Sequence, residues 1–220
     1  MNAIQNYTSN GYYEVNAGLR NGTLCHTLTA LANDISAELA TLPAYTGTTY
    51  RAMSTYSENG AAIIAAATQG ADITFPEFLS TSTDAKVADR FGMDKKKYNF
   101  RFTIIGSTGR NIASASIYRD EAEVLFNKGT RFTATLTKVE NDGEYTTHHI
   151  TLTEVAGKTL KRSASNLRKL AVGDKMTTTQ GSAYKYAKAA QNLADKLNAE
   201  QAGTYQVVAH NGGYAVERVA

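Results

Sequence analysis

The seven residues Asp120–Phe126 constrain the fold most, because acidic and apolar side chains alternate along them. If the stretch is a β-strand, Glu121 and Glu123 share one face, and the opposite face is apolar enough to lie on a core. Two carboxylates on one strand face raise each other's pKa unless a cation is near. The stretch is therefore either the wall of a cleft that uses both acids or an exposed face with two solvated glutamates.

The composition is that of an ordinary folded protein. The chain has 220 residues, of which 42% are hydrophobic and 20% charged, which suits one large domain or one domain with an appendage. A formal net charge of +3 is too small to indicate nucleic-acid binding. No apolar run reaches the length of a membrane span, and the first residues lack the pattern of a signal peptide. We expect a monomer with no nucleic-acid or membrane partner.

The cysteine and histidine content argues against a metal site. Cys25 is the single cysteine, so the chain can form no internal disulfide and shows no Cys/His metal spacing. We interpret Cys25 as a buried thiol among helix-forming residues. His148 and His149 are adjacent, which places them on opposite faces of a strand, and we interpret both as structural. We therefore expect no metal.

Helical spacing dominates the first part of the chain. Apolar residues in steps of three and four between Leu24 and Leu39 predict an amphipathic helix that ends before Pro43. The alanine-rich segment Asn59–Gly70 predicts a second helix with its glycine as the stop signal. Between the two helices, Thr48–Met53 is typical of a short strand.

Strand patterns follow. Phe78-Leu79 predicts a strand, and Thr83 or Asp84 could cap a helix whose apolar face holds Val87, Ala88 and Phe91.

Aromatic and polar residues then alternate from Tyr98 to Ile105, which predicts a strand with Arg101 facing away from the aromatic side. Lys95–Lys97, just before it, is interpreted as a solvated loop. Arg131–Val139 and Glu144–Val155 predict two more strands, joined by the hairpin signal Asn-Asp-Gly.

These elements predict an α+β fold, because most strands come after the N-terminal helix. We place the main domain at residues 1–170 and a small C-terminal module at residues 171–220. Helical spacing from Tyr186 to Leu197 predicts a helix in this module. Tyr205–Val208 and Tyr214–Val219 predict a hairpin, and the role of the module stays open. Arg162 and Arg168 lie in a basic stretch before it.

Three polar motifs come in a fixed order: Arg51, then Ser80-Thr81-Ser82, then the two glutamates. An arginine can hold a pyrophosphate through a bidentate fork. Serine hydroxyls at a strand end can orient a carboxylate, and a glutamate can stabilise an oxocarbenium-like sugar, as in glycosidases. NAD contains both a pyrophosphate and a cleavable ribose–nicotinamide bond, so the three motifs together fit NAD cleavage.

In this order the motifs resemble those of mono-ADP-ribosyltransferases of the Arg-Ser-Glu type, a group that includes bacterial actin-modifying toxins and related effectors. The resemblance runs from about Tyr7 to about Val139 and includes the Tyr- and Asn-rich opening. It implies a split two-sheet sandwich with N-terminal helices. It also implies NAD as co-substrate and transfer of ADP-ribose to an arginine of a target protein, in the cytoplasm of a target or host cell.

The resemblance also implies a role for each motif residue. Arg51 would hold the NAD phosphates, Ser80 would orient the catalytic glutamate, and Glu123 would be that glutamate. Glu121 would position and deprotonate the acceptor arginine, and Tyr118 would face the target protein. The further NAD contacts that the resemblance implies are Tyr7, Tyr12, Asn16, Thr81, Ser82 and Arg101.

Two other functions stay open. An NAD glycohydrolase would use the same cleft with water as the acceptor, although Glu121 favours transfer. A non-catalytic binding module on the same scaffold is the other alternative, and the presence of Arg51, Ser80 and both glutamates favours catalysis over it. Ala52 departs from the glycine or arginine that is common in the family at this position.

Overall fold

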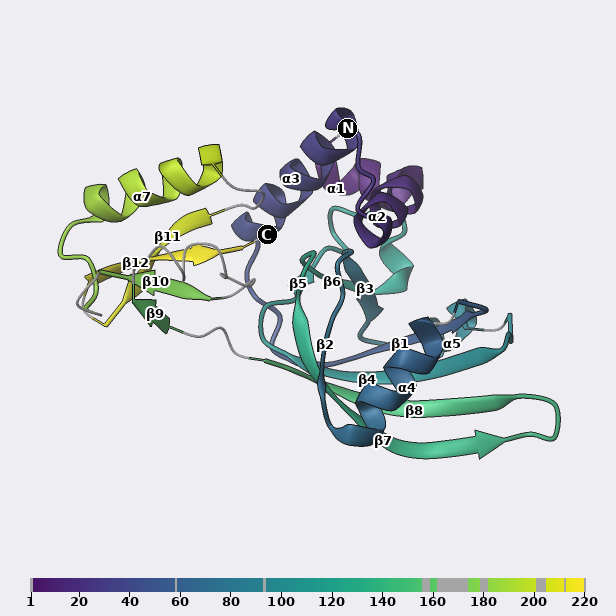
Figure 1. Ribbon diagram of the computed structural model, residues 1–220. Helices are drawn as coiled ribbons and strands as arrows, with labels where there is room; N and C mark the ends of the chain where they lie inside the picture. Colours follow the sequence, from purple (N-terminus) through teal and green to yellow (C-terminus); the bar gives the residue numbers. More distant parts are fainter. Residues whose placement is uncertain are drawn as a thin grey trace.

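The structure is a computed structural model that describes residues 2–57, 59–92, 94–155, 159–161, 174–178, 182–200, 205–211 and 213–219. Within these residues, a larger part combines N-terminal helices with an eight-stranded sheet (Figure 1). A smaller part combines a four-stranded sheet with the helix α7.

Helices form the start of the chain. They are α1 (Ala3–Asn6), a π-helix (Tyr7–Gly11), α2 (Tyr12–Asn21) and α3 (His26–Thr41). Gly22, at a φ of 65°, ends α2 in the left-handed conformation that glycine adopts without strain. The predicted helix at Leu24–Leu39 is confirmed, since α3 ends two residues before Pro43. The prediction of a buried Cys25 was wrong, because this residue precedes α3 and is exposed.

The larger sheet has the strand order β2-β7-β8-β4-β1-β3-β6-β5. All neighbouring strands pair antiparallel except β4 and β8, which pair in parallel. In chain order the strands are β1 (Gly47–Thr55), β2 (Asp72–Thr74), β3 (Leu79–Ser82), β4 (Tyr98–Gly106), β5 (Arg110–Asn111), β6 (Glu123–Phe126), β7 (Arg131–Asn141) and β8 (Thr146–Glu154).

This sheet is almost divided in two between β1 and β3. A single residue pair, Tyr50 with Ser82, joins these two strands. By contrast, β1 pairs with β4 along its whole length, from Gly47 to Thr55. The predicted α+β fold with a split sheet is therefore confirmed, with the two halves still linked at one point.

Two helices follow β1 and β3. They are α4 (Asn59–Gln69), as predicted, and α5 (Ala85–Phe91), which is capped by Asp84 through the backbone N–H of Lys86 at 2.8 Å. Val87 and Ala88 of α5 are buried. The prediction that Phe91 joins them in the core was wrong: it is 64% exposed, because α5 ends there.

Each half of the sheet has its own hydrophobic core. One core, under α4, is rich in phenylalanine and includes Phe100, Phe102 and Phe132. The other joins the N-terminal helices to the segment just before β3 and to β6 through residues such as Ile35, Phe78 and Leu125. Strand β6 contributes to both, because Val124 and Phe126 enter the first core and Leu125 enters the second.

The strand predicted at Asp120–Phe126 is shorter than expected. Arg119–Glu121 form a 3-10 turn, and Ala122 has a φ of 46°. A left-handed residue interrupts the extended backbone, so pairing with β3 starts only at Glu123. The two glutamates therefore do not share a strand face, and all four residues of β6 are buried instead of presenting an exposed acidic side.

The other predicted strands are present. In β4 the aromatic side is buried and Arg101 is exposed, as its alternation predicted. The hairpin between β7 and β8 turns at Gly143, whose φ is 91°. Asn141 stabilises this turn, because its side-chain oxygen accepts from the N–H of Gly143 at 2.8 Å.

The smaller sheet has the order β11-β12-β10-β9. Its elements are β9 (Thr159–Lys161), β10 (Lys175–Thr177), α7 (Ala187–Glu200), β11 (Tyr205–His210) and β12 (Gly213–Arg218). Ala190, Leu193 and Leu197 pack with Met176 and Val216 in its core, so the predicted helix and hairpin are confirmed.

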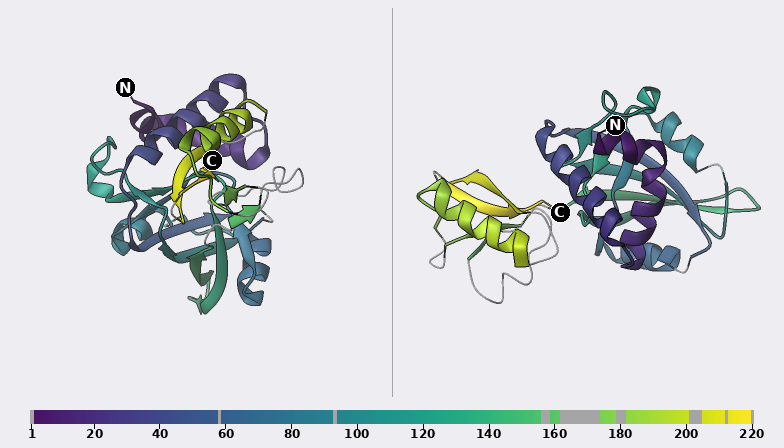
Figure 2. Two further views of the ribbon diagram at one scale, coloured as in Figure 1. Left: turned by 90° about the vertical axis from the view of Figure 1, so that its left-hand side faces the viewer. Right: turned by 90° about the horizontal axis from the view of Figure 1, so that it is seen from above.

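The smaller part lies beside the larger one when the molecule is seen from above (Figure 2). Asn127, just after β6, donates from its side chain to the carbonyl of Val219. The domain boundary at residue 170 stays a prediction, and Arg162, Arg168 and Ala171 lie outside the described residues. No helix in the described part is long and apolar enough to cross a membrane.

Candidate active site

A cavity of about 550 Å³ opens where the sheet divides, between the N-terminal helices and the ends of β1, β3 and β6. This volume lies in the usual range for small-molecule sites, roughly 300–1,000 Å³. The predicted site residues that line it are Tyr7, Tyr12, Asn16, Arg51, Ser80, Thr81, Ser82, Tyr118, Glu121 and Glu123. We call this cavity the cleft.

Glu123 is the buried acid of the cleft, with 5% of its surface exposed. The hydroxyl of Ser80 donates to its Oε1 at 2.5 Å. Burial raises the pKa of Glu123 to about 7, and the nearby charge of Glu121 adds to this, while the Ser80 hydrogen bond and Arg51 oppose it. Near neutral pH the group can therefore exist in either protonation state, and a bound cation favours its charged form.

Arg51 brings a positive charge to the same place. Its Nη1 donates to the carbonyl of Ser80 at 2.7 Å, which fixes the guanidinium against β3. Its Nε is buried and has no hydrogen-bond partner among the described residues. Burial lowers the pKa of Arg51, although arginine stays protonated in proteins. Because a buried donor without a partner is costly, this N–H marks a place where an anionic ligand would be stabilised.

Thr81 and Ser82 use their hydroxyls within the protein. Thr81 donates to the carbonyl of Val124 at 2.6 Å, and Ser82 donates to the carbonyl of Glu121 at 2.7 Å. The Ser82 oxygen also accepts from the N–H of Asp84 at 3.0 Å. These two residues hold β6 and the preceding turn in place, and their direct contact with NAD stays a prediction.

Tyr7 and Asn16 join the N-terminal helices to the cleft. The Asn16 side chain donates to the Tyr7 hydroxyl at 3.0 Å and accepts from the N–H of Phe78 at 3.2 Å. Burial raises the pKa of Tyr7 well above its usual value, so it stays a neutral phenol. Tyr12 lies edge-on to Tyr7 and is 48% exposed, which places it at the mouth of the cleft.

Glu121 and Tyr118 lie on the outer wall. Both line the cleft, and the Tyr118 side chain is 48% exposed. Partial burial and the neighbouring Asp120 raise the pKa of Glu121, while Arg90 lowers it. The two acids thus differ in environment: Glu123 is buried and held by a hydroxyl, whereas Glu121 sits in a turn at the cleft mouth.

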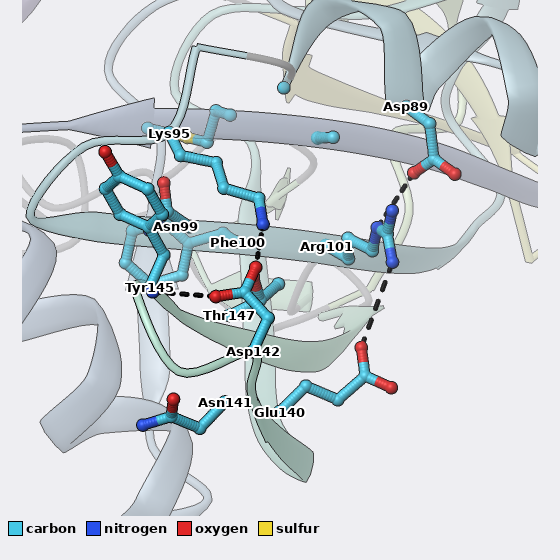
Figure 3. Close-up of a pocket in the computed structure, with 13 residues that line it drawn as sticks. Asp89, Lys95, Asn99, Phe100, Arg101, Glu140, Asn141, Asp142, Tyr145 and Thr147 are labelled. Atoms are coloured by element: carbon cyan, nitrogen blue, oxygen red, sulfur yellow. Dashed lines mark hydrogen bonds and ion pairs between the residues drawn. The ribbon is translucent and has the colours of Figure 1, made fainter.

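The structure does not bring Arg101 to the cleft. Its Nε lies 2.9 Å from Asp89 and its Nη1 lies 3.9 Å from Glu140, in a second cavity of about 430 Å³ (Figure 3). The reason is the register of β1 and β4, which pairs Arg51 with Phe102 and Ala52 with Arg101, so that Arg51 and Arg101 face opposite sides of the sheet. Arg101 is therefore placed away from the other predicted residues.

The cleft is also lined by residues that were not predicted as site residues, among them Thr8, Asp94, Lys96 and Phe91. Lys96 lines the cleft, and the buried side chain of Asn99 holds its backbone through two 2.8 Å hydrogen bonds. The sequence signal that could have indicated Lys96 was the basic run Lys95–Lys97, which follows the serine-rich strand end. On its own, such a run is typical of a solvated loop. Among the residues described, no group of three or more potential metal ligands is present.

Comparisons with known proteins agree with this geometry. The model of the ADP-ribosyltransferase exoenzyme family matches residues 1–159. The NAD(+)–protein-arginine ADP-ribosyltransferase Tre1 of Pseudomonas putida is 37% identical over 133 residues, which cover 59% of this chain and 24% of Tre1. The chain spans only 15% to 30% of the lengths of the curated relatives it matches.

Solved structures share the fold. The ADP-ribosyltransferase Vis of Vibrio splendidus, in complex with agmatine, has a TM-score of 0.56 at 23% identity, covering 84% of this chain and 82% of Vis. Exoenzyme S of Pseudomonas aeruginosa, with human 14-3-3 protein beta and carba-NAD, has a TM-score of 0.53 at 22% identity, covering 68% and 70%. With a family match over most of its length, this chain belongs to the ADP-ribosyltransferase exoenzyme family.

Proposed function

We propose that this protein transfers ADP-ribose from NAD to an arginine of a target protein and releases nicotinamide. The observation that carries the proposal is the arrangement at the split of the sheet. Glu123 is buried and held by Ser80, while Arg51, whose Nε has no hydrogen-bond partner among the described residues, and Glu121 line the same cleft. The family match, the names of the curated relatives and the carba-NAD in Exoenzyme S support it.

The cations of the cleft account for NAD binding. Arg51 has a free N–H in a buried position, where a charge-assisted hydrogen bond to a phosphate oxygen is strong. Lys96 is a second cation that lines the cleft, and its Nζ lies over the ring of Tyr56, 6.0 Å from the ring centroid. We therefore assign the pyrophosphate of NAD to Arg51, as the resemblance implied, and we assign the second contact with NAD to Lys96 in place of Arg101.

Glu123 acts on the ribose. As the C1′–N bond breaks, its electron pair leaves with nicotinamide, which becomes neutral, and positive charge develops at C1′. An ionised Glu123, held by Ser80 at 2.5 Å, stabilises that charge without having to reorient. The positive nicotinamide ring of bound NAD favours ionisation of the glutamate, whose pKa is about 7 in the empty cleft.

Glu121 acts on the acceptor. A guanidinium is protonated at neutral pH and must lose a proton before its nitrogen can attack C1′. Glu121 lies at the mouth of the cleft, where a protein side chain can enter, and its raised pKa makes it a better base. The new C1′–N bond forms on the guanidine, and the proton passes to Glu121.

The proposal includes the setting of the reaction. We propose a monomeric enzyme that uses NAD as its co-substrate. Its partner is a protein with an accessible arginine, in the cytoplasm of a target or host cell.

The test is incubation of the protein with labelled NAD and a cell lysate, followed by mass spectrometry of labelled proteins. We expect ADP-ribose on arginine side chains. Consumption of NAD without any labelled protein or peptide would instead support the glycohydrolase alternative. Failure to bind NAD in calorimetry would support a binding module without catalytic activity.

A further inference from the structure

The acceptor side of the cleft is a loop of residues 113–122, which we call the acceptor loop. It carries Tyr118 and Glu121, both of which line the cleft. Its end is fixed to β3: the Glu121 carbonyl accepts from Ser82 at 2.7 Å, and the Ala122 carbonyl accepts from Thr83 N–H at 3.1 Å. Its start is fixed by the N–H of Ala115, which donates to the Ile112 carbonyl at 2.9 Å.

The middle of the acceptor loop has a different anchor. The backbone N–H of Ile117 donates to the hydroxyl of Thr8 at 3.3 Å, which joins the loop to the N-terminal helices. Ser116 is buried and its hydroxyl accepts from the N–H of Tyr118 at 3.0 Å, whereas Ile117 and Tyr118 are each 48% exposed, so packing of these two side chains does little to hold them. The Thr8 hydroxyl therefore connects the wall that carries Tyr7 with the wall that carries Tyr118.

Thr8 is well fixed for such a task. It is 6% exposed and lies in the π-helix Tyr7–Gly11, a type of turn that is rare and frequent at functional sites. Its hydroxyl lies 3.4 Å from the carbonyl of Gln5, to which it can donate while accepting from Ile117. Gly11 permits this wide turn, because a Cβ there would lie 2.9 Å from the backbone oxygen of Asn6.

We propose that Thr8 is a positioning residue that holds the acceptor loop, and with it Tyr118 and Glu121, in register with the NAD-binding wall. This inference rests on the proposed function. Without the hydrogen bond the middle of the loop loses its link to the π-helix, and the acceptor guanidine is aligned less well with C1′. Water, which needs no such alignment, then captures a larger share of the activated ribose.

The experiment measures how each enzyme divides NAD between two products. Agmatine serves as a small guanidine acceptor, and ADP-ribosyl-agmatine and free ADP-ribose are quantified in one reaction. Thr8→Val keeps the shape but removes the hydroxyl, and a neutral hydrogen bond of typical strength predicts a roughly fivefold lower ratio of transfer to hydrolysis. Thr8→Ser keeps the hydroxyl and should keep the ratio.

Thr68→Val is the matched control. Thr68 also donates its hydroxyl to a carbonyl of its own helix, that of Ile64 at 2.8 Å, but it is exposed on α4 and does not line the cleft. The ratio of transfer to hydrolysis in Thr68→Val should equal that of the unchanged protein. Equal ratios for Thr8→Val and Thr68→Val would overturn the proposal.

A second measurement separates this proposal from the proposed function. If the unchanged protein forms no agmatine adduct, the proposed transfer to arginine is refuted. The loop anchor can still be tested, by hydrogen–deuterium exchange at the Ile117 amide. We expect faster exchange in Thr8→Val than in Thr8→Ser, and equal exchange would refute the anchor. Thr8→Ala serves as the second variant if thermal unfolding shows that Thr8→Val does not fold.

Discussion

Two cavities flank α5, and their charges are arranged in opposite ways. In the second cavity the charges are paired, since Arg101 contacts Asp89 and Glu140, and Lys95 contacts Asp142 (Figure 3). In the cleft, the Nε of Arg51 has no partner among the described residues, and burial raises the pKa of Glu123.

This difference between paired and unpaired charges indicates which charged groups can act on a ligand. Exposed ion pairs such as that of Arg101 with Asp89 contribute little to stability and leave no group in need of a partner. A buried donor without a partner and a buried acid with a raised pKa are unfavourable in the empty protein, and they become favourable when a ligand of the right charge binds. The cleft, and not the second cavity with its paired charges, is therefore the candidate active site.

The largest expected effect is at Glu123. Glu123→Gln removes the preorganised charge at the developing cation, and losses of this kind cost about a hundredfold to a thousandfold in rate. Both protein labelling and NAD hydrolysis should fall together. The measurement follows nicotinamide release and labelling in parallel, and normal nicotinamide release would place the catalytic centre elsewhere.

The second effect separates the two glutamates. Glu121→Gln removes the base for the acceptor, and general-base catalysis contributes about a hundredfold or more. Transfer to arginine should therefore drop by about that factor, while NAD hydrolysis stays measurable, because Glu123 and Ser80 are untouched. The same two assays apply, and arginine labelling at the normal rate would contradict the assigned role of Glu121.

The sequence was a good guide to elements that depend on local patterns. The periodicity around Leu24–Leu39, the alternation in Tyr98–Ile105 and the Asn-Asp-Gly hairpin each act within one element, so their spacing alone predicts them. The split sheet was predicted through the family resemblance, which rests on the order of the three motifs, because residue patterns within single elements do not predict how a sheet divides.

The sequence was a poor guide where a position depends on distant partners. Nothing in the residue type of Ala122 indicates a φ of 46°, so the strand was extended over Glu121 in error. Arg51 and Arg101 both lie on strands next to aromatic residues, and they are separated by the register of β1 and β4, which pairs Arg51 with Phe102 and Ala52 with Arg101, so that the two arginines face opposite sides of the sheet. Lys96 enters the cleft because Asn99 holds its backbone, which no pattern of charges reveals.

The third prediction compares the two arginines directly. Arg51→Ala should weaken NAD binding at least about tenfold, since a hydrogen bond to a charged group contributes about 1.5–3 kcal/mol. Arg101→Ala, which removes an exposed ion pair, should change it less than about twofold. Calorimetry with NAD measures both, and a larger loss for Arg101→Ala would reverse the assignment of the two cavities.

The smallest effect is a pH dependence from Glu123. Its pKa is raised to about 7 by burial, and the proposed reaction requires the ionised form. Activity at low NAD concentration reports the pKa of the free enzyme, so kcat/KM should rise as pH increases through about 7. Between pH 7 and pH 8 the ionised fraction grows from about half to about nine tenths, which predicts an almost twofold increase.

The matched measurement uses Ser80→Ala, which loses the hydrogen bond that lowers the pKa of Glu123. Its profile should shift to higher pH, and an unchanged midpoint would show that a group other than Glu123 controls the profile.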